Sequence, residues 1–107
     1  MVTLILSPDW THYLWVMDGP AFDDGQLRLS ASLRAELNSY SKLHAELYFR
    51  EGSPSEVDLD LLEEKGVAAW KRLRKEVGSD YDVQFYSHKF QERFCTPEEW
   101  AAVSNQA

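Results

Sequence analysis

The stretch from Ser53 to Gly78 constrains this chain more than any other, because it predicts one long helix with both ends marked. Ser53 is a predicted N-cap, Pro54 fits the first helical position, and Glu56 completes a capping box. Gly78 supplies a C-terminal stop. Apolar residues recur along one stripe at Leu59, Leu62, Trp70, Leu73 and Val77, and Gly66 and Ala69 lie on the same stripe, three or four residues from other members of it. This stripe must be buried against a second layer of structure.

Gly66 is the unusual member of the stripe, because glycine inside a helix costs about 1 kcal/mol relative to alanine. We expect close packing of Gly66 against a strand or a neighbouring helix. The alternative is a hinge or a contact point for a partner, and no nearby residue supports it.

A second helix is predicted just before the first. Ser30 is its expected N-cap, and the helix runs from about Ala31 to Phe49. Its apolar stripe follows the same spacing and comprises Leu33, Leu37, Tyr40, His44 and Leu47. Gly52 ends the helix, and the next cap follows almost at once. So short a connection predicts an antiparallel pair of helices.

Three segments have the composition of strands. Val2 to Leu6 is short, apolar and β-branched. His12 to Met17 alternates little, which predicts a central strand with both faces covered, and it is expected to pair with the first as a hairpin. Tyr81 to Tyr86 alternates and predicts a strand with one buried face. A capping box at Thr96 to Glu99 predicts a short C-terminal helix.

The predicted fold class is therefore α+β. We expect a small, mainly antiparallel sheet of about three strands, with two long antiparallel helices on one face and a short C-terminal helix. At 107 residues the chain has room for a single domain, 1–107, with 88–107 as a C-terminal extension. This extension contains three large aromatic residues that must be shielded from solvent: Phe90, Phe94 and Trp100. We expect them to dock on the open face of the sheet, with a second copy of the chain as the alternative.

The charge of the chain restricts its partners. The formal net charge of −7 disfavours binding to nucleic acid or to an anionic membrane and favours either a basic partner or simple solubility. Cys95 is the only cysteine, so no intrachain disulfide is possible, which suits a reducing cytosol. The N-terminus resembles neither a signal peptide nor a membrane span. We therefore expect a cytoplasmic protein.

No pattern in the sequence is typical of catalysis. The histidines have no metal-ligand spacing, and we expect no cofactor and no metal. His44 lies on an apolar stripe, where a core histidine is the favoured interpretation. The loop carrying Asp18, Asp23 and Asp24 lacks the alternation of a calcium loop, so a solvated loop is favoured over a cation site. Cys95 with His88 is imaginable as a nucleophile pair, although no oriented base is evident.

Five short motifs carry a resemblance that spans about Tyr13 to Phe85. They are Leu29-Ser30-Ala31-Ser32-Leu33-Arg34, Ser53-Pro54, Glu64-Lys65-Gly66, Leu73-Arg74-Lys75-Glu76-Val77-Gly78 and Tyr81-Asp82-Val83. In this pattern the chain resembles small acidic, largely uncharacterised bacterial proteins of the immunity-protein type. Those proteins open with an aromatic strand, and the first strand here, Val2 to Leu6, is less aromatic than theirs. The resemblance implies a protein that neutralises a bacterial toxin, and it identifies no functional residues.

The leading hypothesis is an acidic cytosolic immunity protein, not an enzyme, that inhibits a bacterial toxin by occluding its active site. Its partner would be a basic toxin domain, and the protein itself a monomer or homodimer. The expected partner-binding residues are acidic or aromatic: Trp10, Trp15, Asp18, Asp23, Asp24, Glu51, Glu56, Asp58 and Asp60. Two alternatives stay open: an adaptor that dimerises through its aromatic tail, and a small enzyme using Cys95, His88 or the loop aspartates. The identity of the protein encoded by the neighbouring gene would distinguish these hypotheses, because a toxin would favour inhibition and metabolic genes would favour the enzyme.

Overall fold

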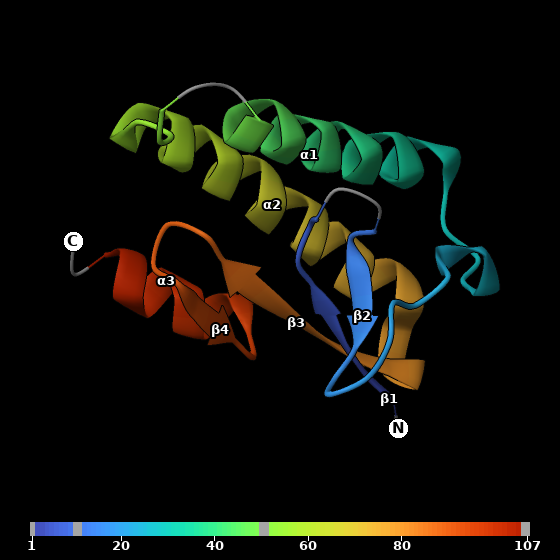
Figure 1. Cartoon of the computed structure of the whole chain (residues 1–107). Helices are drawn as coiled ribbons and strands as arrows, with labels where there is room; N and C mark the ends of the chain where they lie inside the picture. The colour runs from blue at the N-terminus through green and yellow to red at the C-terminus, as the bar shows by residue number, and fades with distance from the viewer. Residues whose placement is uncertain (1, 10–11, 50–51, 106–107) are drawn as a thin grey trace.

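Two long helices lie side by side across one face of a mixed sheet in the computed structural model, which describes residues 2–9, 12–49 and 52–105 (Figure 1). The described elements in chain order are β1 (Val2–Leu6), β2 (Leu14–Val16), the 3-10 turn η1 (Asp24–Gln26), α1 (Ala31–Phe49), α2 (Glu56–Val77), η2 (Gly78–Asp80), β3 (Tyr81–Ser87), β4 (Glu92–Phe94) and α3 (Pro97–Ser104). The predicted α+β class is confirmed, as are the predicted bounds of α1.

The sheet has four strands in the order β2-β1-β3-β4. Its hairpins, β1 with β2 and β3 with β4, are antiparallel, whereas the central pair of β1 and β3 is parallel. The sequence had predicted about three strands and did not identify β4. The helical pair separates β1 and β2 from β3, and a connection of this length allows two central strands to run in the same direction.

The prediction that His12 to Met17 forms a central strand is wrong. The strand is shorter, Leu14–Val16, and lies at an edge of the sheet. Its outer side is occupied by the chain that follows, through a bridge from Trp15 to Ala21 and a hydrogen bond from the Phe22 N–H to the Leu14 carbonyl, 2.8 Å. Leu14 is buried, and Trp15 and Val16 are half-buried, so neither face of this edge strand is fully exposed, which accounts for the weak alternation that suggested a central position.

The core lies between the helical stripes and one face of the sheet. Every residue of the predicted α1 stripe is buried, which confirms that prediction. On α2, Trp70 is fully buried, stacks on Phe85 with ring centroids 5.2 Å apart, and donates its indole N–H to the Val83 carbonyl at 2.8 Å. That bond satisfies the one polar atom of a large side chain placed in an apolar layer.

Gly66 lies where α2 comes closest to both neighbouring layers. A Cβ atom added there would stand 2.8 Å from ring atoms of Tyr40 on α1 and of Phe85 on β3. Both rings are fully buried, so neither has room to move aside. The expectation of close packing at Gly66 is confirmed.

The start of α2 differs from the prediction, because its N-cap is Ser55 and not Ser53. The Ser55 hydroxyl accepts from the Asp58 N–H at 3.1 Å, and the Asp58 carboxylate accepts from the Ser55 N–H at 3.0 Å. The segment contains two overlapping capping patterns two residues apart, and the second one forms. Pro54 therefore precedes the cap. At the other end Gly78 closes the helix with φ of 64°, as expected.

The C-terminal tail docks on its own chain, but not where the sequence suggested. Thr96 caps α3 as predicted, accepting from the Glu99 N–H at 3.2 Å. The expectation that the tail covers the open sheet face is wrong, because Trp100 reaches α2 and donates its indole N–H to Glu63 at 2.8 Å. The helical side offers both an apolar contact for the ring and an acceptor for its N–H.

Candidate functional site

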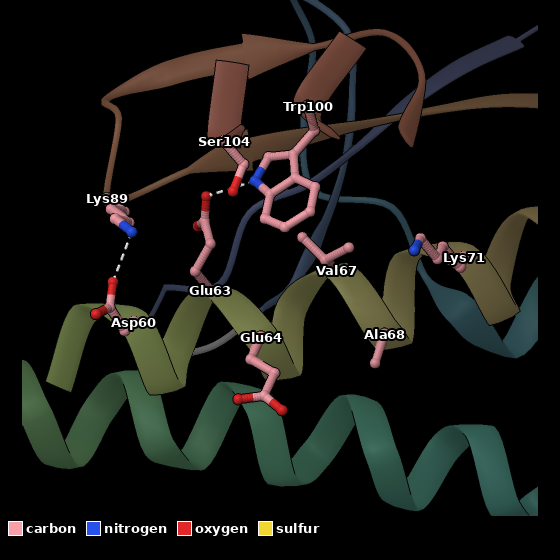
Figure 2. Close-up of a pocket in the computed structure, with 9 residues that line it drawn as sticks. All are labelled: Asp60, Glu63, Glu64, Val67, Ala68, Lys71, Lys89, Trp100 and Ser104. Atoms are coloured by element: carbon pink, nitrogen blue, oxygen red, sulfur yellow. Dashed lines mark hydrogen bonds and ion pairs between the residues drawn. The ribbon is translucent and has the colours of Figure 1, made fainter. Parts of the chain in front are cut away.

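A cleft of about 480 Å³ opens between α2 and α3 (Figure 2). We call it the α2–α3 cleft, and it is lined by Asp60, Glu63, Glu64, Val67, Ala68, Lys71, Lys89, Trp100 and Ser104. The α2 residues recur at steps of three and four, so the geometry of a helix places them along one side. Lys89 comes from the turn after β3, and α3 supplies the opposite wall.

Glu63 forms the inner wall of the cleft and is only 4% exposed. One of its carboxylate oxygens accepts hydrogen bonds from the Ser87 hydroxyl and from the Trp100 indole N–H. The Ser87 oxygen itself accepts from the Phe90 N–H at 2.9 Å. Glu63 thereby joins α2, the end of β3 and α3 at one buried point.

Burial raises the pKa of the Glu63 carboxyl, because a low-dielectric environment disfavours the charged form. The hydrogen bonds from Ser87 and Trp100, together with Lys89, act in the opposite direction and support the carboxylate. Removal of one of these donors would destabilise the fold, because it leaves a buried acceptor without that hydrogen bond.

Lys89 crosses one end of the cleft and bonds to Asp60, with 2.6 Å between Nζ and the carboxylate oxygen. This hydrogen bond raises the pKa of Lys89, and the charges of Glu63 and Glu56 contribute in the same direction. Figure 2 shows Lys89 and Asp60 facing one another, while Glu64 lies on the outer rim, turned away from Trp100. We call the part of the cleft around Asp60, Glu63 and Glu64 its acidic end.

The open face of the sheet holds a second depression, of about 550 Å³. It is lined by Ile5, Ser7, Trp15, Tyr86 and Arg93. The Trp15 indole N–H donates to the Ser7 carbonyl at 2.8 Å, which fixes the ring against the sheet. Arg93 is the one charged residue among the described residues that line it, so the depression is mainly apolar.

Two histidines, the buried His44 and the half-buried His88, form a further cluster where α1 ends beside the turn after β3. The rings of His44 and His88 have centroids 4.7 Å apart, and Tyr48 and Tyr86 pack against them. Within the described part of the chain, neither Nδ1 atom has a hydrogen-bond partner. Burial, with the neighbouring His44, lowers the pKa of His88 to about 4, and burial also lowers the pKa of His44.

The structure divides the predicted partner-binding residues into two groups. Glu56, Asp58 and Asp60 stand at the start of α2, whereas Trp15 and the three loop aspartates Asp18, Asp23 and Asp24 lie on or after β2. The 19 residues of α1 stand between the groups, a length of about 28 Å. Figure 1 shows the start of α2 at one end of the helical pair and the turn that precedes α1 near the other end, while β2 lies in the sheet beneath the helices. Trp10 and Glu51 lie outside the described residues.

Several of these acids already have local partners. Asp58 completes the cap of α2, and Asp23 caps η1. Asp24 accepts from the Tyr13 hydroxyl and pairs with Arg34 at 3.1 Å. Asp60 is the member of the predicted set that lines the α2–α3 cleft. A partner-binding role for each of the nine stays a prediction.

Sequence reasoning missed Glu63 and Trp100 as members of a site. One signal was available for Glu63, since it is an acidic residue between Leu62 and Gly66 on an otherwise apolar stripe. Its partners Ser87 and Trp100 are 24 and 37 residues away, and no local pattern connects them.

The described residues do not assemble a recognisable catalytic centre. The register of β3 with β4 pairs Ser87 with Glu92 and Phe85 with Phe94, so His88 and Cys95 lie at opposite ends of that hairpin. Across residues 2–9, 12–49 and 52–105, no group of three or more histidine, cysteine or acidic side chains is placed to hold a metal ion. Among the helices of the same segments, none is both long and apolar enough to cross a membrane.

One comparison with known proteins gives a clear result. A family model described as Serratia CdiI immunity protein-like matches residues 3–88. The match runs from β1 to the turn after β3, and it therefore contains the helical pair but neither β4 nor α3. A search of curated proteins found no match.

Proposed function

We infer, because the chain belongs to the Serratia CdiI immunity protein-like family, that it is an immunity protein which binds a bacterial toxin and occludes its active site. The family match over residues 3–88 is the observation that carries this proposal. Binding alone is sufficient for such inhibition, so the protein needs no catalytic centre of its own. We propose that it acts in the cytoplasm, where it meets the toxin before the toxin reaches its substrate.

The charge of the chain supports a basic toxin domain as the partner. The formal net charge is −7, and opposite charges on two proteins speed their encounter. Exposed charges lose much of this attraction at physiological salt, where screening acts over about 8 Å. Association should therefore slow as salt rises, while dissociation changes less.

The first test uses the product of the neighbouring gene, which the proposal predicts to be a toxin domain. Expression of that domain alone should arrest growth, and co-expression of this chain should restore it. Purified chain should bind the domain and abolish its activity in vitro at equimolar concentration. The proposal is refuted if the chain neither protects cells nor binds the domain.

Docking of the tail also bears on the adaptor alternative. Phe94 is 3% exposed, and Trp100 is partly buried against α2. The tail therefore leaves little aromatic surface for dimerisation, and no described feature favours that function over toxin binding.

A further inference from the structure

We propose that the α2–α3 cleft receives an arginine side chain of the toxin, with its aliphatic stem against Trp100 and Val67 and its guanidinium at the acidic end. This inference rests on the proposed function and adds the surface and the chemistry of recognition. It makes the cleft the part of this chain that determines which toxin is bound.

The wall of the cleft suits the stem of a long side chain. Trp100 is only half-buried, so part of its ring faces the cleft, and Figure 2 shows Val67 behind it, directed towards that ring. The hydrogen bond from Trp100 to Glu63, at 2.8 Å, holds that ring in place before any partner arrives. A fixed aromatic wall loses little conformational entropy on binding, and the methylene stem of a long cationic side chain packs readily along an apolar surface.

The charges of the cleft favour a cationic occupant over an anionic one. Asp60, Glu63 and Glu64 lie together, and Glu56 is close enough for its charge to act on Lys89. Lys89 is paired with Asp60 at 2.6 Å, and the buried Glu63 accepts from Ser87 and Trp100, so the exposed carboxylate of Glu64 carries the remaining negative charge. Lys71 stands seven residues beyond Glu64, about 10 Å along the helix, so it leaves the acidic end unneutralised.

Arginine fits this arrangement better than lysine does. Its planar guanidinium has five donors in a fixed fork and can bind a carboxylate through two parallel hydrogen bonds, which the ammonium group of lysine does not do. Glu64 is exposed on the rim, so its carboxylate is open to a partner. The depression on the open sheet face gives no such indication, because Arg93 is its one charged lining residue among those described.

The position of the cleft relative to the family match points to a role in specificity. The match ends at residue 88, so Lys89 and the α3 wall with Trp100 lie outside it. The α2 side, in contrast, belongs to the matched region. One wall of the cleft is therefore additional to the family core, which suits a surface that selects one toxin.

The decisive experiment fills the rim of the cleft without disturbing the core. Ala68 lines the cleft and is exposed, and Ala35 is an exposed alanine on α1 outside the cleft. Ala68→Trp should weaken binding of the neighbouring gene's toxin domain about 100-fold, as loss of a central anchor does, whereas Ala35→Trp should change it less than about 3-fold. Melting curves of both variants check that each is folded.

A second pair of variants tests the charge. Glu64→Arg should slow association about 10-fold at low salt, while Glu46→Arg, at an exposed glutamate on α1, should have a much smaller effect. Double-mutant cycles of Glu64→Arg against each toxin arginine should identify one strongly coupled arginine. Absence of coupling with every toxin arginine would overturn the inference.

The outcomes distinguish this inference from the proposed function. If wild-type chain binds and inhibits the toxin while Ala68→Trp and Glu64→Arg behave as wild type, the cleft is not the site and the immunity function stands. If wild-type chain does not bind, the proposed function fails, and the inference fails with it.

Discussion

Acidification should destabilise this fold through the histidine pair, and His88→Gln should remove much of that sensitivity. The pKa of His88 is lowered from 6.5 to about 4 by burial and by the neighbouring His44. Between these two values the unfolded chain binds the proton and the folded chain does not, so stability falls as pH falls. The stabilisation is complete above the unfolded pKa and is lost on the way down to the folded one.

The size of the effect follows from the difference of pKa. Each unit corresponds to 1.36 kcal/mol, so His88 alone accounts for a loss of about 3 kcal/mol between pH 6.5 and pH 4. The lowered pKa of His44 adds in the same direction. The raised pKa of Glu63 acts in the opposite direction, since the folded state then holds its proton more tightly. Because Glu63 is present in both proteins, its contribution cancels when variant and wild type are compared.

Urea denaturation followed by tryptophan fluorescence, from pH 7.5 to pH 4, measures this difference. At pH 7.5 we expect His88→Gln to be less stable by about 1–2 kcal/mol, because its packing against Tyr86 and His44 is lost. Towards pH 4 the two stability curves should converge or cross. His12→Gln, at an exposed histidine, controls for the loss of one imidazole. Parallel curves for wild type and His88→Gln would refute the reasoning.

Three further predictions concern the fold. Ser55→Ala should lower the free energy of unfolding by about 1 kcal/mol through loss of the cap, and Ser53→Ala should leave the denaturation midpoint unchanged. Gly66→Ala should lower the melting temperature despite better helix propensity, because its new Cβ would stand 2.8 Å from two buried rings; an unchanged or higher value would contradict that packing. We also propose that the chain is one domain. Circular dichroism and fluorescence melts should then coincide, and deletion after Ser87, which removes the Trp100 donor to Glu63, should lower the midpoint.

The helices were predictable because their signals are local. Ser30 and the stripe from Leu33 to Leu47 predicted α1 correctly, because a cap and a buried stripe both depend on residues only a few positions apart. The predicted start of α2 was wrong because two capping patterns overlap within the segment 53–58. Capping preferences alone do not indicate which of the two forms. The parallel pairing of β1 with β3 could not be derived, because alternation identifies a strand but not its neighbour.

The candidate site was less predictable than the fold. The acidic composition suggested a binding surface, but it combined residues such as Asp24 and Asp60 that lie at opposite ends of α1. The α2–α3 cleft depends on Trp100, whose position is set by a contact 37 residues away along the chain. A sequence pattern indicates that an aromatic residue needs cover, and only the fold shows what covers it.

The parallel pairing at the centre of the sheet also determines when, during synthesis, this protein becomes complete. Val2 pairs with Tyr81 and Leu6 with Phe85, so partners are separated by 79 positions. The first strand leaves the ribosome early, and until β3 emerges β2 is the one strand paired with it. Until then its exposed edge is open to pairing with other nascent chains. Under the proposed function, a cell therefore gains protection only from chains translated at least through β3.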